Sequence, residues 1–223
     1  MKVTALQARG RNRQRVDVYL DGKRAFSLTA LEAAGLRLGQ DISQEEIAGL
    51  RERDVRQEAH ETALRYLGYR PRSAEEVRRH LEEHGFPSEV QRETLAHLRE
   101  SGFLDDVAFV HFWVENREQF RPRGRRALRY ELRQKGIDAE LIEEALASVD
   151  EEASAYEAAR PQAVRLVQQR LETQAFSHKL GQFLIRRGYG YEVVRRVVSR
   201  LWRELRDDHP TESEEEEAPD QSG

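Results

Sequence analysis

Three segments of the sequence share one pattern: SAEEVRRHLEEHGF at residues 73–86, GRRALRYELRQKGI at 124–137 and FSHKLGQFLIRRGY at 176–189. In each segment two aliphatic residues stand four apart, and a glycine follows four residues after the second. Residues four apart lie on one face of a helix. Glycine adopts the left-handed backbone that ends a helix without the steric cost of a Cβ atom. The pattern therefore predicts one amphipathic helix and its closing turn, made three times in one chain.

The equivalence extends beyond the glycine, at spacings of 51 and then 52 residues. The matching positions are Val77, Leu128 and Leu180; Leu81, Leu132 and Leu184; Gly85, Gly136 and Gly188; Val90, Leu141 and Val193; and Leu95, Leu146 and Val198. Ser88 and Asp138 stand where the N-cap of a following helix is expected. A further helix is predicted before each segment, at roughly 44–67, 107–119 and 154–172. Each repeat is therefore predicted to be a three-helix unit that cannot bury its apolar face well alone.

The first thirty residues have the pattern of strands rather than helices. Hydrophobic and polar residues alternate over 16–20, and Asp21-Gly22 is a two-residue hairpin turn signal before a return strand at 25–28. Residues 3–8 are a candidate third strand. The period then changes, because Thr29 and Ser43 each precede a Glu by three residues, which is the capping-box pattern that begins a helix.

These patterns predict a mainly α fold with a small β extension. We expect a β-hairpin extension at 1–43, three-helix repeats at 44–106, 107–150 and 151–206, and an acidic tail at 207–223 with the low-complexity composition of a disordered segment.

Charge is strongly segregated along the chain. The formal net charge is −4, but residues 207–220 hold eight acids and no Lys or Arg, so the remainder carries +4. Residues 117–135 hold eight Lys or Arg against two acids, whereas 138–157 hold eight acids and no Lys or Arg. Basic blocks of this kind fit nucleic acid or an acidic protein surface, and they also fit solvated helix faces.

The composition excludes several classes of site. The chain has no cysteine, which leaves no disulfide framework and no thiolate chemistry, and fits a cytoplasmic protein. No run approaches the ~20 apolar residues of a membrane span, and the N-terminus has no apolar signal segment. There is no G-x-x-x-x-G-K-[ST] phosphate loop and no G-x-S-x-G nucleophile elbow. We therefore expect no enzyme active site.

One motif nevertheless resembles a zinc site. HLEEH at 80–84 matches the H-x-x-E-H pattern of inverted zinc peptidases. The repeat argues against metal binding, because the positions equivalent to His80 are Glu131 and Phe183. We interpret His80 and His84 as residues of a helix C-terminal turn, where cations interact favourably with the helix dipole.

The repeats resemble the RecX family of regulatory proteins, over about residues 59–206. The first family motif appears as Arg70-Pro71-Arg72-Ser73 before a helix. The G-x-L-D-D-x-x-F motif appears as Gly102, Leu104, Asp105, Asp106 and Phe109. The third appears as Gly124, Leu128, Glu131, Leu132, Lys135, Gly136 and Ile137. The third repeat is looser, with Phe183 in place of the Glu and Phe176 in place of the first Gly. The hairpin also resembles an extension that some members carry.

The resemblance implies a curved, elongated array of three three-helix units. Members of the family modulate the RecA recombinase, binding in the groove of its filament on single-stranded DNA and limiting filament growth, ATP hydrolysis and strand exchange. The resemblance implies no catalytic residue, metal or cofactor. The expected partners are therefore RecA and its filament, with DNA a further candidate partner. The expected form of the chain is a monomer.

The densest basic segment is the candidate contact surface. It contains Arg121, Arg123, Arg125, Arg126, Arg129 and Arg133. Arg129 and Arg133 share one helical face, and arginine binds carboxylates or phosphates through two parallel hydrogen bonds. An alternative is that these arginines pair with the acids of 138–157. The paired acids Asp105 and Asp106 are expected to cap the helix that begins near Val107. The aromatic residues expected in the core are Phe112, Trp113, Phe183, Tyr189 and Trp202.

Overall fold

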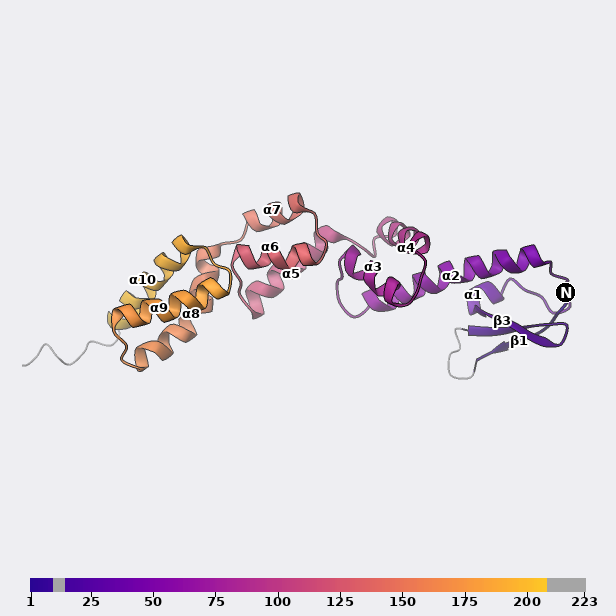
Figure 1. Cartoon of the computed structure of the whole chain (residues 1–223), viewed down its shortest axis with the longest axis horizontal. Coiled ribbons are helices and arrows are strands. Elements are labelled where there is room, and N and C mark those ends of the chain that lie inside the picture. Colours follow the sequence, from indigo (N-terminus) through magenta and orange to yellow (C-terminus); the bar gives the residue numbers. More distant parts are fainter. Residues whose placement is uncertain (10–14, 208–223) are drawn as a thin grey trace, which may run out of the picture. The chain divides into compact units, whose positions relative to one another are not determined.

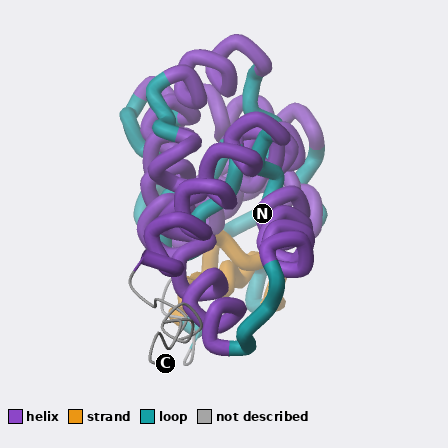
Figure 2. Tube along the Cα trace, turned by 90° about the vertical axis from the view of Figure 1, so that its left-hand side faces the viewer, coloured by secondary structure: helices purple, strands orange, loops and turns teal. Residues whose placement is uncertain are grey.

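The computed structural model describes residues 1–9 and 15–207 (Figure 1). Contacts divide the chain into two compact units, Met1–Asp106 and Val107–Gly223. Helices account for most of the trace, and the strands are confined to one small sheet (Figure 2). The acidic segment predicted as a tail lies outside the described residues, except for Asp207 at the end of the last helix.

The sheet of the first unit has three antiparallel strands. Strand β2 (Arg15–Leu20) lies between β1 (Val3–Ala8) and β3 (Lys23–Thr29). Asp21 and Gly22 have φ angles of 48° and 82°. Positive φ at both central residues is the geometry of the two-residue turn that matches strand twist. The predicted hairpin and the candidate third strand are both confirmed.

One long helix joins the sheet to the first helical repeat. The short helix α1 (Ala30–Ala33) follows the sheet, and α2 (Gln44–Leu67) begins at the predicted Ser43 capping box. Asp54 on α2 is only 5% exposed and accepts hydrogen bonds from the Thr29 backbone N–H and from Arg15, the latter at 3.1 Å. A buried carboxylate is tolerated only when it is paired in this way. Asp54 therefore fixes the sheet against α2.

The first repeat is completed by α3 (Ala74–Glu83) and α4 (Ser88–Glu100). Their apolar residues pack with the C-terminal half of α2 around fully buried Val77 and Leu81. The Ser73 side chain accepts from the Glu76 N–H, and Glu76 accepts from the Ser73 N–H, so α3 has a complete capping box. The prediction for Ser88 was wrong: the N-cap of α4 is Pro87, and Ser88 is the first helical residue.

The second unit contains two sets of three helices. The first set is α5 (Asp106–Phe120), α6 (Arg125–Gln134) and α7 (Ala139–Ala147). The second set is α8 (Glu151–Gln168), α9 (Thr173–Arg186) and α10 (Tyr191–Asp207). Each set surrounds its own core, with Leu128 and Leu132 in one and Leu180 and Leu184 in the other, all fully buried. The repeat register deduced from the sequence is confirmed.

The helix-ending glycines behave as predicted. Gly85, Gly136 and Gly188 have φ angles of 80°, 72° and 87°, in the left-handed region that other residues rarely adopt. Asp138 is the N-cap of α7, with its carboxylate accepting from the Glu140 N–H at 2.9 Å.

Two glycines bring the helical sets of the second unit into direct backbone contact. The Gly124 N–H donates to the Arg187 carbonyl oxygen at 3.0 Å. A Cβ atom on Gly124 would lie 2.3 Å from the Gly188 carbonyl oxygen, and one on Gly188 would lie 2.5 Å from the Ala127 Cβ. Only glycine fits at these two positions, which explains how two three-helix sets form a single compact unit. The boundaries at 107–150 and 151–206 stay a prediction of how the repeats divide.

Candidate functional site

Most of the basic segment 121–133 lies in helix α6, so some of its residues face the core and others face solvent. Leu128 and Leu132 face the core, so the residues between them fall on the flanks or in solvent. The helix follows Gly124, an N-cap with extended backbone and no side-chain hydrogen bond. The arginines predicted as one contact surface therefore divide into two groups with different surroundings.

Arg125 and Arg129 are held by groups of the second unit. Arg129 binds the Glu143 carboxylate through two hydrogen bonds of 2.6 and 2.7 Å. This pairing raises the pKa of Arg129 and lowers the pKa of Glu143. The Arg125 guanidinium donates to the Val149 carbonyl oxygen at 2.7 Å. The alternative drawn from the sequence, pairing with the acids of 138–157, describes Arg129 well, and both residues brace α6 against its neighbours.

The other four arginines have no ion pair within the described part of the chain. Arg121, Arg126 and Arg133 are exposed, and Arg123 is half-buried. Arg133 lies near enough to Glu143 to lower the pKa of that carboxyl, after the larger effects of Arg129, but forms no salt bridge with it. Side chains of this kind remain available for carboxylates or phosphates of a partner.

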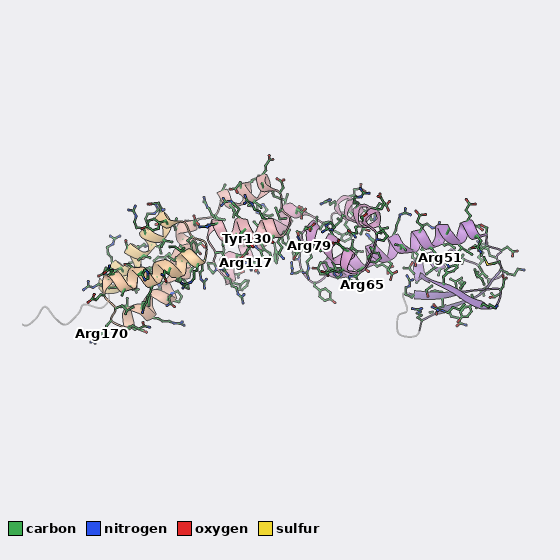
Figure 3. All side chains as sticks on the ribbon, in the orientation of Figure 1. Arg51, Arg65, Arg79, Arg117, Tyr130 and Arg170 are labelled. Atoms are coloured by element: carbon green, nitrogen blue, oxygen red, sulfur yellow. The ribbon has the colours of Figure 1, made fainter. Side chains whose placement is uncertain are left out.

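An exposed aromatic residue lies among these arginines and was missed from the sequence. Tyr130, labelled in Figure 3, lies on α6. Its side chain is 65% exposed. Arg126, Tyr130 and Arg133 stand at positions i, i+4 and i+7, so they share one side of the helix, which we call the exposed α6 face. An exposed aromatic ring between two arginines can stack on a base or fill an apolar pocket. Its separation by four and three residues from the arginines was the signal in the sequence that could have identified it.

The flank beside this face is a closed cluster around Trp113. The Arg117 guanidinium lies 4.3 Å from the Trp113 ring centroid, and the Lys135 ammonium lies 5.1 Å from it. The Glu131 carboxylate accepts from Trp113 Nε1 at 2.9 Å and from Arg117 Nε at 2.8 Å. The family-motif residue Glu131 is therefore engaged in packing α6 against α5. Of the aromatic residues expected in the core, Tyr189 is buried. The others are each only half-buried: Phe112, Trp113, Phe183 and Trp202.

The corresponding flank of the first repeat has different chemistry. The His80 ring stacks on Tyr66 with 3.9 Å between ring centroids, and the Arg72 guanidinium lies 3.9 Å from the same ring. The His84 ring is tilted against His80, and its Nδ1 donates to the His80 carbonyl oxygen at 2.7 Å. Across the described residues, no three His, Asp or Glu side chains gather into a group that could hold a metal ion. HLEEH is the end of α3 and its turn.

The remaining family-motif residues have structural positions. Leu104 and Phe109 are buried, and Gly102 has a φ of 72°. The expectation that Asp105 and Asp106 both cap the following helix needs correction, because α5 begins at Asp106 itself. The Asp106 carboxylate instead accepts from the Ala74 N–H at 2.8 Å, and so caps α3.

The same contact recurs one repeat later. The Arg125 N–H, equivalent to that of Ala74, donates to the Glu151 carboxylate at 3.0 Å. Asp106 and Glu151 are the first residues of α5 and α8, so in both cases a carboxylate at one helix start satisfies the N-terminus of another. These N-termini already hold a negative charge and are not anion sites.

The described helices and sheet define a helical-repeat protein with an exposed basic face. Profiles of the first, second and third three-helix domains of RecX match residues 59–107, 105–146 and 152–198. The chain belongs to the RecX family of regulatory proteins.

Relatives and solved structures agree with this assignment. Regulatory protein RecX of Clostridium botulinum (strain Alaska E43) is 30% identical over 202 residues, covering 88% of this chain and 94% of the relative. That of Bacillus licheniformis is 33% identical over 196 residues, covering 86% and 74%. A crystal structure of regulatory protein RecX aligns with a TM-score of 0.68 and 25% identity, covering 89% of this chain and 98% of that one. Among the described residues, no helix has the length and apolar composition needed to cross a membrane.

Proposed function

We propose that this chain is a non-enzymatic regulator that binds the RecA recombinase, or its filament on single-stranded DNA, in the filament groove. Binding there inhibits filament growth, ATP hydrolysis and strand exchange during recombination and DNA repair. The chain acts as a monomer in the cytoplasm. Membership of the RecX family supports the regulatory role.

The observation that carries the contact assignment is the exposed α6 face. Arg126 and Arg133 flank Tyr130 there without a salt bridge to any described residue, and exposed Arg121 lies just before the helix. Arginine and tyrosine are the residue types that most often dominate binding energy at interfaces. Unpaired arginines also speed encounter with an acidic partner and give binding that weakens with salt. The proposed mechanism is steric and electrostatic: the helical repeats occupy the groove and bridge subunits.

Direct binding tests this proposal. The chain is titrated onto preassembled recombinase filaments on fluorescently labelled single-stranded DNA, and onto the same DNA without recombinase. Tight binding to the filament and weak binding to bare DNA is the expected result. Failure to bind the filament would overturn the proposal.

The alternative is a stand-alone DNA-binding protein, and the same face favours it, since an aromatic ring between arginines also suits single-stranded DNA. The salt dependence of binding separates the two. Affinity for bare DNA that equals affinity for the filament, and falls steeply with salt, would establish the alternative.

A further inference from the structure

A five-residue motif, an aromatic residue and Arg-Pro-Arg followed by a small residue, occurs twice at the repeat spacing of 51 residues. It reads Tyr-Arg-Pro-Arg-Ser at residues 69–73 and Phe-Arg-Pro-Arg-Gly at 120–124. Both copies lie between the first and second helices of a three-helix set, after α2 and at the end of α5. We call them the aromatic-Arg-Pro-Arg loops.

The aromatic residue of each loop is exposed to solvent. Tyr69 is 86% exposed and Phe120 is 67% exposed. A large ring left in water twice, at equivalent positions, gives up the hydrophobic stabilisation that burial would supply. The core registers of the two repeats are complete without these rings. Their shared position therefore indicates a role outside the fold.

The two loops share both arginines, but the arginines do not form the same ion pairs. Arg70 binds Glu76 at 2.9 Å, whereas the equivalent position to Glu76 in the second loop is Ala127, and Arg121 forms no described ion pair. Arg72 and Arg123, the second arginines, both lack a carboxylate partner within the described residues. Arg72 is held against Tyr66 by its guanidinium. The features that recur are therefore one exposed ring and one half-buried arginine.

The third repeat has no such loop. The position equivalent to Tyr69 and Phe120 is Glu172, and the segment joining α8 to α9 has no proline and no aromatic residue. The element belongs to the first two repeats, although all three share the same buried register.

We infer that the two aromatic-Arg-Pro-Arg loops are anchors for a protein partner that presents the same site more than once: an apolar pocket with a carboxylate at its rim. The ring fills the pocket and the second arginine meets the carboxylate. The inference rests on the proposed function, because a filament of identical recombinase subunits is a partner that repeats. It assigns the main contact to the first two repeats.

The charge pattern favours a protein over nucleic acid at these loops. Binding to a phosphodiester backbone uses several cations along one groove. The first loop offers one arginine without an ion pair among the described residues, Arg72, and Glu75 and Glu76 stand three and four residues after it. What the loops share most fully is an apolar ring, which suits a pocket.

Alanine substitution of the rings provides the test. Tyr69→Ala, Phe120→Ala and the double variant are compared with Phe103→Ala and Tyr191→Ala, which remove exposed rings from the first and second units at positions that do not recur. Affinity is measured for the recombinase filament and for bare single-stranded DNA. All four rings are solvent-exposed, and circular dichroism checks that each variant is folded.

We expect each loop variant to weaken filament binding about tenfold and the double variant about a hundredfold, while the controls bind like the wild type. A double variant that binds the filament as tightly as the wild type would overturn the inference and leave the proposed function standing. An equal loss of affinity for bare DNA would also overturn it, since the rings would then contact nucleic acid. A wild-type chain that fails to bind the filament would overturn both.

Discussion

Helices α3 and α6 are equivalent helices of successive repeats, but the charged residues on their exposed surfaces are paired differently. Both bury two aliphatic residues four apart, Val77 with Leu81 and Leu128 with Leu132. On the surface of α3, Arg78 binds Glu75 at 2.8 Å and Glu82 at 3.1 Å, and Arg79 binds Glu75 at 2.7 Å. On the surface of α6, Arg126 and Arg133 have no such partners among the described residues.

This difference distinguishes the buried residues that stabilise the fold from the exposed residues that we propose for the partner contact. The buried register is shared, so it cannot distinguish the roles of the two helices. Hydrogen bonds from Arg78 and Arg79 lower the pKa of Glu75, and α3 thereby satisfies its own charges. Helix α6 pairs Arg129 with Glu143 but leaves Arg126 and Arg133 without an ion pair among the described residues, and we propose that these two contact the partner. Four predictions test this difference between α3 and α6, in decreasing order of effect.

Leu81→Ala and Leu132→Ala should damage the fold to a similar degree. Each removes a fully buried side chain from the same register position, which lowers the free energy of unfolding by about 3 kcal/mol. Urea denaturation followed by circular dichroism measures both. Tyr130→Ala on the exposed α6 face is the control and should change stability by less than about 0.5 kcal/mol. A cost for either leucine as small as that of the control would contradict the shared register.

The residues before the two helices should respond differently to substitution. Gly124→Ser introduces a Cβ atom against the Gly188 carbonyl oxygen and should cost about 1–3 kcal/mol, although serine is a better N-cap. Ser73→Ala removes the capping box of α3 and should cost about 1 kcal/mol. Thermal unfolding of both variants decides the order. A Gly124→Ser variant more stable than the wild type would show that the close approach of the two backbones is absent.

Charge reversal should affect binding only on α6. The double variant Arg126→Glu/Arg133→Glu should bind the recombinase filament about tenfold more weakly, a loss of about 1.4 kcal/mol, with unchanged unfolding. Arg78→Glu/Arg79→Glu breaks exposed pairs on α3, so it should lower stability slightly and leave filament affinity unaltered. Equal effects of the two variants on binding would mean that the α6 face has no special role.

The His80 stack should give the first repeat a small dependence on pH. Burial lowers the pKa of His80 most, and His84 adds to the effect, with Glu83 opposing it and Arg72 and Arg65 contributing less. Because the folded pKa lies below the unfolded value of about 6.5, stability is present above that pH and is lost as the pH falls below it. His80→Gln should reduce the loss in urea midpoint between pH 7.5 and 5.5. An identical loss in variant and wild type would place the dependence elsewhere.

Much of the fold could be predicted from the sequence because it depends on local patterns. The glycines at 85, 136 and 188 and the leucines before them repeat, and helix periodicity and chain reversal follow directly from such spacing. The close approach of Gly124 and Gly188 could not be predicted, because it joins residues 64 apart that show no pattern of their own. The N-cap at Pro87 was missed because Ser88 has the more typical capping side chain.

Less of the candidate site could be predicted from the sequence. The density of arginine over 121–133 was visible, but the division between Arg129, which binds Glu143, and Arg126, which does not, depends on where α7 packs. Likewise the Ala74 N–H is capped by Asp106, 32 residues away, so Asp106 was assigned to the wrong helix. Local charge patterns indicate which residues are charged, and only packing determines which of them remain unpaired.

We propose that the chain regulates a recombinase filament through the exposed α6 face. The most direct measurement is the rate of ATP hydrolysis by the recombinase on single-stranded DNA, with the chain added at sub-stoichiometric ratio. We expect the wild type to slow hydrolysis and Arg126→Glu/Arg133→Glu to do so much less, while Arg78→Glu/Arg79→Glu acts like the wild type. Hydrolysis that is unchanged by the wild type, or slowed equally by all three proteins, would contradict this proposal.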